Sequence, residues 1–104
     1  MTIQINTDKN LTVHESFNAK LHSLLSRELN RYSENITRLE VHLSDENGNK
    51  EGQNDKRCMI EARIEGRQPI AVKDLGNTHD LAISGAIEKL KSVLNSLLGK
   101  LSNH

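Results

Sequence analysis

Aromatic residues, cysteine and long apolar runs are scarce or missing in this chain, and each shortage excludes a type of core, cross-link or membrane segment. Phe17 and Tyr32 are its only aromatic residues, so a hydrophobic core must be built from Leu, Ile, Val and Ala. The single cysteine, Cys58, cannot form an internal disulfide, which is typical of proteins from a reducing compartment. No apolar run approaches the roughly 18 residues of a membrane-spanning helix. The N-terminus lacks the basic start and apolar run of a signal peptide. We therefore expect a cytoplasmic protein without a membrane partner.

Net charge is also missing, because 14 basic residues balance 14 acidic ones. Nucleic-acid binders gain much of their affinity by neutralising phosphates with Lys and Arg. Zero net charge therefore counts against a strongly electrostatic binder, although the placement of charges matters more than their sum. The length of 104 residues suits one domain with one core. We expect a single domain over residues 1–104, since no linker or internal repeat divides it.

Motifs for catalysis and metal binding are absent from the sequence. Five histidines lack the paired spacing of a zinc site: His14, His22, His42, His79 and His104. The stretch from Asp45 to Gly48 is faintly similar to a calcium loop, but Lys56 stands where that loop needs a glutamate. Cys58 shares the alternation of an apolar strand face, which predicts a buried thiol. We expect no enzyme, no metal, no cofactor and no small-molecule substrate.

Alternation of apolar and polar residues predicts four strands. Short strands are expected at residues 2–6 and 70–75, and longer ones at 37–44 and 57–65. Pro69 precedes the last of them, which suits an edge strand. A polar loop separates the two long strands, and a tight turn containing glycine separates the last two.

Apolar residues at three- and four-residue intervals predict two helices, at residues 13–33 and 80–101. Thr12 with Glu15 is expected to cap the first helix, and the residues from Gly76 to Thr78 can cap the second. The apolar stripe of the second helix is predicted to include Ile83, Ala86, Ile87, Leu90, Val93, Leu94, Leu97, Leu98 and Leu101. Gly85 interrupts that helix and suggests a point of close packing.

The predicted order is β-α-β-β-β-α, which favours an α+β fold with a four-stranded, mainly antiparallel sheet and both helices on one face. The opposite face is expected to carry charged and polar residues, namely Arg38, Glu40, His42, Glu61, Arg63 and Glu65. Such a face is either solvated or available to a partner.

Basic residues follow the flanks of both predicted helices. Those on the first helix are Lys20, Arg27 and Arg31, which project within about 40° of one another. Those on the last helix are Lys89 and Lys100 on one flank and Lys91 elsewhere. Long basic side chains also cover core edges with their aliphatic stems. Spacing alone favours this solvated interpretation over phosphate contact.

The central segments ITRLEVHLSDENG and DKRCMIEARIEGRQPIAV, with the closing AIEKL, resemble the ribosome hibernation promoting factor family. This family is also called ribosome-associated inhibitor or sigma-54 modulation protein. The resemblance runs from Ile3 to about Leu101, and the length is similar to the family's short form. It implies a fold similar to double-stranded-RNA-binding domains, and a protein that is monomeric when free.

The resemblance also implies a function without catalysis. Family members bind the small ribosomal subunit, its 16S rRNA and ribosomal proteins, near the decoding centre. There they block mRNA and tRNA binding in idle ribosomes, in stationary phase or under stress. Carried onto this chain, the expected rRNA-binding residues are Lys20, Arg27, Arg31, Lys73, Lys89, Lys91 and Lys100. The last helix holds fewer basic residues than is typical of the family, with Ser92, Ser96, Leu98 and Ser102 among its members.

Two alternatives stay open. Arg63 and Arg67 match the family phrase EARxEGRQP, but Arg63 could equally pair across the sheet with Glu40 or a neighbour. The whole chain could be a protein-interaction module with weak or no RNA affinity. In that case Leu97, Leu98 and Leu101 would extend the apolar stripe into a dimer contact.

Overall fold

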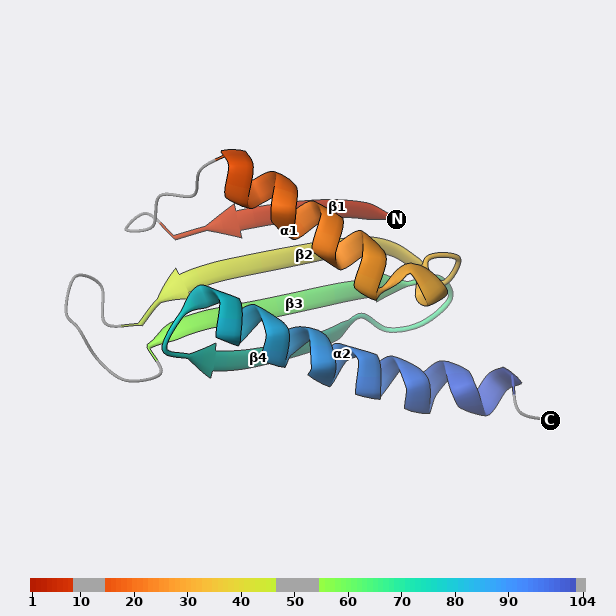
Figure 1. The fold of residues 1–104 in the computed structure, drawn as a ribbon. Coiled ribbons are helices and arrows are strands. Elements are labelled where there is room, and N and C mark those ends of the chain that lie inside the picture. Colours follow the sequence, from red (N-terminus) through yellow and green to blue (C-terminus); the bar gives the residue numbers. More distant parts are fainter. Residues whose placement is uncertain (9–14, 47–54, 103–104) are drawn as a thin grey trace.

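The computed structural model describes residues 1–8, 15–46 and 55–102. The strands are β1 (Thr2–Thr7), β2 (Ile36–Asp45), β3 (Lys56–Ile64) and β4 (Ile70–Gly76). The helices are α1 (Glu15–Glu28), the short 3-10 helix η1 (Asn30–Tyr32) and α2 (His79–Ser102). Figure 1 shows these elements in the predicted order β-α-β-β-β-α, which confirms the α+β fold.

The strands form one four-stranded sheet in the order β1-β2-β3-β4. The pairs β2–β3 and β3–β4 are antiparallel, as expected of strands joined by short connections. β1 pairs with β2 in parallel, because α1 and η1 carry the chain back across the sheet before β2 begins. The sheet is thus mainly antiparallel as predicted, and β4 is an edge strand that Pro69 directly precedes.

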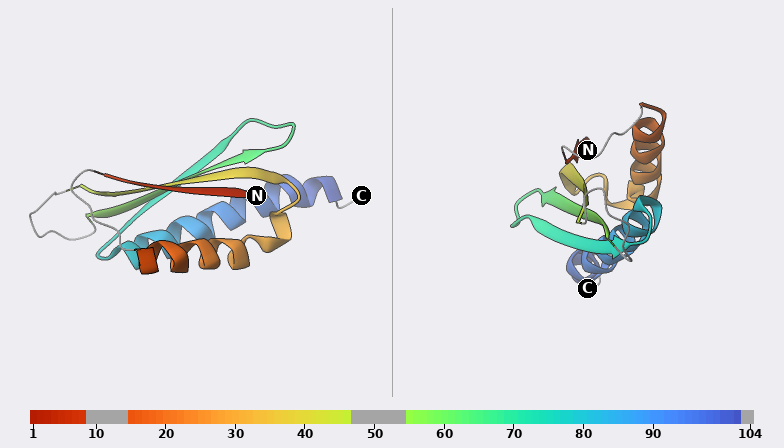
Figure 2. Two further views of the ribbon diagram at one scale, coloured as in Figure 1. Left: turned by 90° about the horizontal axis from the view of Figure 1, so that it is seen from above. Right: turned by 90° about the vertical axis from the view of Figure 1, so that its left-hand side faces the viewer.

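Both helices cover the same face of the sheet, and the other face is open (Figure 2). On the open face the register places Arg38 opposite Arg63 and Glu40 opposite Glu61. Like charges opposite each other are unfavourable, and each arginine instead pairs along its own strand. Arg38 Nε lies 3.0 Å from Glu40 Oε1, and Arg63 Nε lies 3.4 Å from Glu61 Oε1. Of the suggested partners for Arg63, the structure shows a neighbour, Glu61 on the same strand, and not Glu40, which Arg38 holds.

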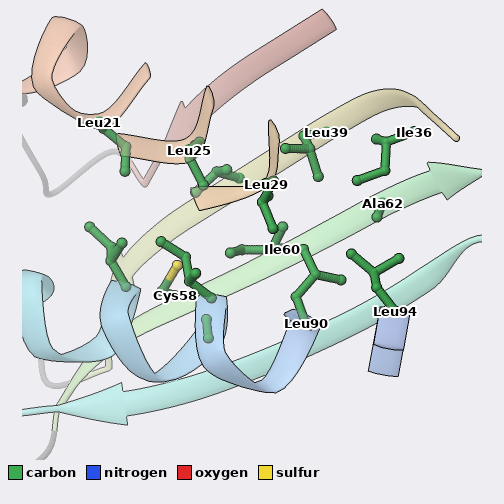
Figure 3. Packing of buried hydrophobic residues seen from close by; sticks show 14 of the residues in the cluster. Leu21, Leu25, Leu29, Ile36, Leu39, Cys58, Ile60, Ala62, Leu90 and Leu94 are labelled. Carbon is green, nitrogen blue, oxygen red and sulfur yellow. The ribbon is translucent and has the colours of Figure 1, made fainter. Parts of the chain in front are cut away.

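The core lies between the sheet and the two helices, as Figure 3 shows. Leu25 from α1 and Leu90 from α2 are fully buried against Leu39 and Ile60 of the central strands. Cys58 is buried in the same cluster, as its place in the strand alternation predicts. Aliphatic side chains thus make up almost all of the core, as the shortage of aromatic residues requires.

The predicted helix at residues 13–33 is two pieces. α1 ends at Glu28, and Leu29 leaves helical geometry with φ −109° and ψ 13° before η1 begins. Leu29 and Tyr32 lie at this break, and both are buried in the core. The Tyr32 hydroxyl donates a hydrogen bond to Asn95 Oδ1 of α2. Residues 9–14, including the predicted cap Thr12, lie outside the described part of the chain, as do residues 47–54 of the polar loop.

Helix α2 begins as predicted, with the Thr78 hydroxyl accepting a hydrogen bond from the Leu81 amide at 3.1 Å. Its stripe is buried at Ile83, Ala86, Ile87, Leu90 and Leu94. Val93 is 38% exposed, so its assignment to the buried stripe is wrong; three residues after Leu90, it lies about 60° from Leu90 toward the flank of the helix, on the side away from Leu94. Neither α1 nor α2, over the residues described, is long and apolar enough to cross a membrane.

Gly85 marks a close approach between α2 and β4, as its place in the sequence suggested. A Cβ atom there would lie 2.7 Å from Asp74 Cγ and 3.2 Å from Asp74 Cβ. Both separations are shorter than the roughly 3.5–4.0 Å at which carbon atoms pack favourably. The missing side chain therefore makes room for the Asp74 carboxyl group against the helix.

Candidate nucleic-acid interface

A groove of about 750 Å³ lies between α1 and α2. Its inner wall is apolar and includes Phe17 and Leu24 from α1 and the buried Ile83 from α2. Lys20 and Arg27 line the α1 side and are exposed, so they form a basic rim. They share this rim because seven residues are close to two helical turns. The predicted grouping of these two cations is therefore present in the structure.

Arg31 follows them in η1, on the chain that continues directly from α1. Its guanidinium carbon lies 5.3 Å from the centroid of the Tyr32 ring, a cation–π contact. The same tyrosine is fixed by its hydrogen bond to Asn95. Arg27 is 72% exposed, and its Nε lies 3.8 Å from Glu28 Oε2, a long and well-solvated contact. We call Lys20, Arg27 and Arg31 the basic edge.

Lys89 on α2 is held by strand β4. Its ammonium group donates to the Lys73 carbonyl oxygen at 2.9 Å and to Asp74 Oδ1 at 3.2 Å. The first bond satisfies a backbone carbonyl of an edge strand, and the second neutralises the charge of the lysine. Lys89 is therefore already engaged within the protein.

Lys91 on α2 is held by α1. Its Nζ donates to Glu28 Oε1 at 3.3 Å and lies 3.8 Å from Glu88 Oε1. These carboxylates raise the pKa of Lys91, with the hydrogen bond to Glu28 as the largest cause. Lys91 is thus charged at neutral pH, and the carboxylates of Glu28 and Glu88 partly neutralise its charge.

Lys73, on strand β4, is the other candidate whose side chain is described, and it lies apart from the basic edge. Lys73 is exposed on β4, while its neighbours Val72 and Asp74 are half-buried on the helix side. Its side chain therefore points to the open face of the sheet, across from Met59 in the register. Lys100 belongs to α2, but its side chain lies outside the described part of the chain.

Two aspartates stand where the connection between β2 and β3 begins and ends, and Lys56 forms an ion pair with each of them. Lys56 Nζ lies 2.7 Å from Asp45 Oδ2 and 3.3 Å from Asp55 Oδ1. The hydrogen bond to Asp45 is the largest cause of a raised pKa at Lys56. The cation that these carboxylates hold is thus an ammonium group of the protein itself.

Sequence reasoning found the cations but missed the acids that hold two of them. Glu28 and Lys91 are 63 residues apart, so no local spacing could reveal their contact. Asp74 had a weak signal, because strand alternation places it beside Val72 on the helix side and Gly85 leaves a gap on the facing helix. Among the candidate cations with described side chains, Lys89 and Lys91 are held by acids, whereas the basic edge on α1 and η1 and Lys73 on β4 are exposed.

Comparison with known families identifies the chain. A family model described as sigma 54 modulation protein / S30EA ribosomal protein matches residues 3–102. The chain belongs to this family. The resemblance recognised in the central strands is therefore confirmed, and it extends over nearly the whole sequence. The family's description is of ribosomal and sigma 54 modulation proteins rather than enzymes. No curated protein sequence matches the chain.

Solved structures match the fold at low sequence identity. The N-terminal domain of Protein Y from Thermus thermophilus is 21% identical, with 93% of this chain and 99% of that chain covered and a TM-score of 0.72. A ribosomal subunit interface protein from Coxiella burnetii is 12% identical, with 95% and 99% covered and a TM-score of 0.75. At these identities the likeness establishes the fold alone. Similarity to double-stranded-RNA-binding domains stays a prediction.

Proposed function

We propose that this protein is a cytoplasmic ribosome-binding translation inhibitor, a hibernation factor that occupies the decoding region of the small subunit. Its membership of the S30EA ribosomal protein family is the observation that carries the proposal. Two proteins with the same fold support it, since they are Protein Y and a ribosomal subunit interface protein. Inhibition would follow from occupancy, because a bound domain excludes mRNA and tRNA from the space it fills.

The basic edge is the surface we assign to rRNA. Lys20 and Arg27 are exposed along one side of the inter-helix groove, and Arg31 is oriented by its contact with Tyr32. Contacts from such residues go mainly to phosphates and sugars, which position a protein without reading sequence. Helical rRNA is recognised by shape in the same way. Lys73, Lys89, Lys91 and Lys100 are proposed as secondary contacts.

Co-sedimentation with purified 30S subunits through a sucrose gradient tests the proposal. The wild-type protein is expected to migrate with the subunit at moderate salt. The triple variant Lys20→Gln, Arg27→Gln, Arg31→Gln is expected to bind more weakly. Each lost phosphate contact flattens the dependence of log affinity on log salt by about 0.7–0.9. Three contacts correspond to a change of roughly 2–3 units in slope.

A matched control removes the same charge elsewhere. Arg57→Gln, Arg63→Gln, Arg67→Gln also lowers the net charge by three, at positions on the open face or in the β3–β4 turn. Its salt slope is expected to stay within about one unit of wild type. Absence of wild-type protein from the 30S fraction would refute ribosome binding. Equal slopes for the two triple variants would refute the assignment of rRNA contacts to the basic edge.

A second measurement addresses the decoding region. Saturating 30S subunits with the protein is expected to reduce the binding of messenger-directed initiator tRNA in a filter assay. Full tRNA binding on subunits that demonstrably carry the protein would place it at another ribosomal site.

The protein-interaction module remains the second candidate. It is favoured by two apolar side chains exposed on α2, Leu81 at 58% and Val93 at 38%. It is also favoured by the ion pairs that Lys89 and Lys91 form with acids of the protein itself. Sedimentation equilibrium over a wide concentration range tests it. A monomeric mass at high concentration would argue against a dimer contact through α2.

A further inference from the structure

Two lysines of α2 share an unexpected property: each is bound by an acid from a different element of the fold. Lys89 is held by Asp74 of β4, and Lys91 by Glu28 at the end of α1. Both lysines are cations on the helix that the family resemblance assigns to rRNA. The acids therefore occupy the positions that rRNA phosphates would otherwise take.

The contact between Asp74 and Lys89 is built into the packing of α2 on β4. Asp74 points toward the helix, and Gly85 gives its carboxyl group room one turn before Lys89. The Nζ atom of Lys89 is then within 3.2 Å of Asp74 Oδ1 and 2.9 Å of the Lys73 carbonyl oxygen. Two oxygens thus fix the ammonium group against the sheet edge. A phosphate that recruits Lys89 must displace the carboxylate.

The contact between Glu28 and Lys91 joins the two helices. Glu28 Oε1 accepts from Lys91 Nζ at 3.3 Å, and Glu28 Oε2 lies 3.8 Å from Arg27 Nε. One carboxylate therefore faces a cation on each helix. It weakens the local positive potential of α1 as well as that of α2.

We propose that Asp74 and Glu28 are internal competitors that set the affinity of this protein for rRNA. The inference rests on the proposed function. Each acid neutralises a lysine in the free protein and, once displaced, stands as a negative charge close to the phosphate backbone. The pair of Asp74 with Lys89 is exposed on the lysine side, and the pair of Glu28 with Lys91 is only partly buried, so both are weak and reduce binding to rRNA without abolishing it. The protein thereby keeps a basic helix face while remaining easy to release.

Removing either acid should strengthen binding, which is opposite to the usual effect of disturbing an interface. Asp74→Asn and Glu28→Gln are nearly isosteric and leave the lysines in place. Each is expected to tighten 30S binding by about two- to fivefold, the range of an exposed ion pair. The salt slope is expected to steepen by up to about 0.7–0.9 as one more lysine neutralises phosphate.

A net-charge control and a double-mutant cycle separate this effect from a general gain of positive charge. Glu65→Gln makes the same change in net charge at an exposed position after β3. The gain from Asp74→Asn is expected to vanish when Lys89→Met is present, and the gain from Glu28→Gln to vanish with Lys91→Met. Equal gains in Glu65→Gln, gains that persist without the lysines, or no gain at either acid would overturn the proposal.

Elution from a heparin column gives the same comparison without ribosomes. If the wild-type protein fails to bind 30S subunits, the proposed function fails, yet later elution of Asp74→Asn and Glu28→Gln than of Glu65→Gln would still support internal competition. Melting temperatures of all variants establish that the comparison is between folded proteins. Equal elution of the three acid variants would overturn the inference even where ribosome binding holds.

Discussion

Replacing Gly85 with alanine is expected to destabilise the protein, although alanine is the better helix former. Helix propensity alone favours the substitution by about 1 kcal/mol. The structure opposes it, because the added Cβ would lie 2.7 Å from Asp74 Cγ and closer still to a carboxylate oxygen. Asp74 would have to rotate away from α2. Its own Cβ, at 3.2 Å, would remain a tight contact after that rotation.

The magnitude follows from what the rotation costs. Overpacking a well-filled contact costs about 1–3 kcal/mol. Loss of the ion pair between Asp74 and Lys89, which is more than half exposed on the lysine side, adds about 0–1 kcal/mol. Subtracting the propensity gain of about 1 kcal/mol leaves a net loss of roughly 0–3 kcal/mol, centred on about 1.5 kcal/mol. Each kcal/mol corresponds to a fall of about 4–8 °C in melting temperature for a domain of this size.

Urea and thermal unfolding, followed by circular dichroism, measure this difference. Gly99→Ala is the matched control in the same helix, since nothing lies within 4 Å of its added Cβ. It is expected to leave stability unchanged or raise it by a few tenths of a kcal/mol. In an Asp74→Ala background Gly85→Ala should lose the part of its penalty that comes from the carboxyl group, while the 3.2 Å contact with the Cβ of residue 74 remains. A Gly85→Ala protein as stable as wild type would show that the close approach of β4 and α2 is not tight.

Two further predictions concern the core. Burial, with a smaller effect of Asp74, raises the pKa of Cys58 from its usual value near 9 to about 12. The protonated thiol therefore contributes stability that is complete below pH about 9 and is lost as pH rises toward about 12. The free energy of unfolding should fall less steeply over this range in Cys58→Ala than in wild type, and equal slopes would contradict the burial argument. On α2, Leu94→Ala should cost about 2–5 kcal/mol and Val93→Ala within about 0.5 kcal/mol by urea titration; similar costs would refute the assigned helix face.

Much of the fold could be read from the sequence because its periodicities are regular. Alternation located every strand, and the stripe of α2 predicted its buried face except at Val93, which lies at the exposed flank of the stripe. The break after Glu28 could not be predicted, because Leu29 and Tyr32 continue the helical spacing. Both residues are buried in the structure, so the apolar pattern gives no signal of where the helix ends. Whether β1 pairs in parallel also depends on the path of the intervening helix rather than on its own residues.

The candidate interface was harder to predict than the fold. Spacing along α1 grouped Lys20 with Arg27 correctly, because two turns of a helix return to the same side. It could not show that Lys91 reaches Glu28 on another helix. Nor could it show that Lys73 points away from the helices that carry the other cations. Charge patterns in a sequence give the positions of cations, while their availability depends on acids brought near by tertiary structure.

The parallel pairing of β1 with β2 has a consequence for the order of assembly. The pairs β2–β3 and β3–β4 each join strands that follow one another directly in the chain. The pair β1–β2 joins strands separated by α1 and η1, so that Thr2 pairs with Arg38. Closing that longer loop costs more chain entropy, and contacts of high sequence separation form late. Ile3 and Ile5 are only partly buried, so little apolar area recruits the strand early. We therefore expect β1 to be the last strand to join and the first to leave, with amide hydrogens that exchange with solvent ahead of those in β3.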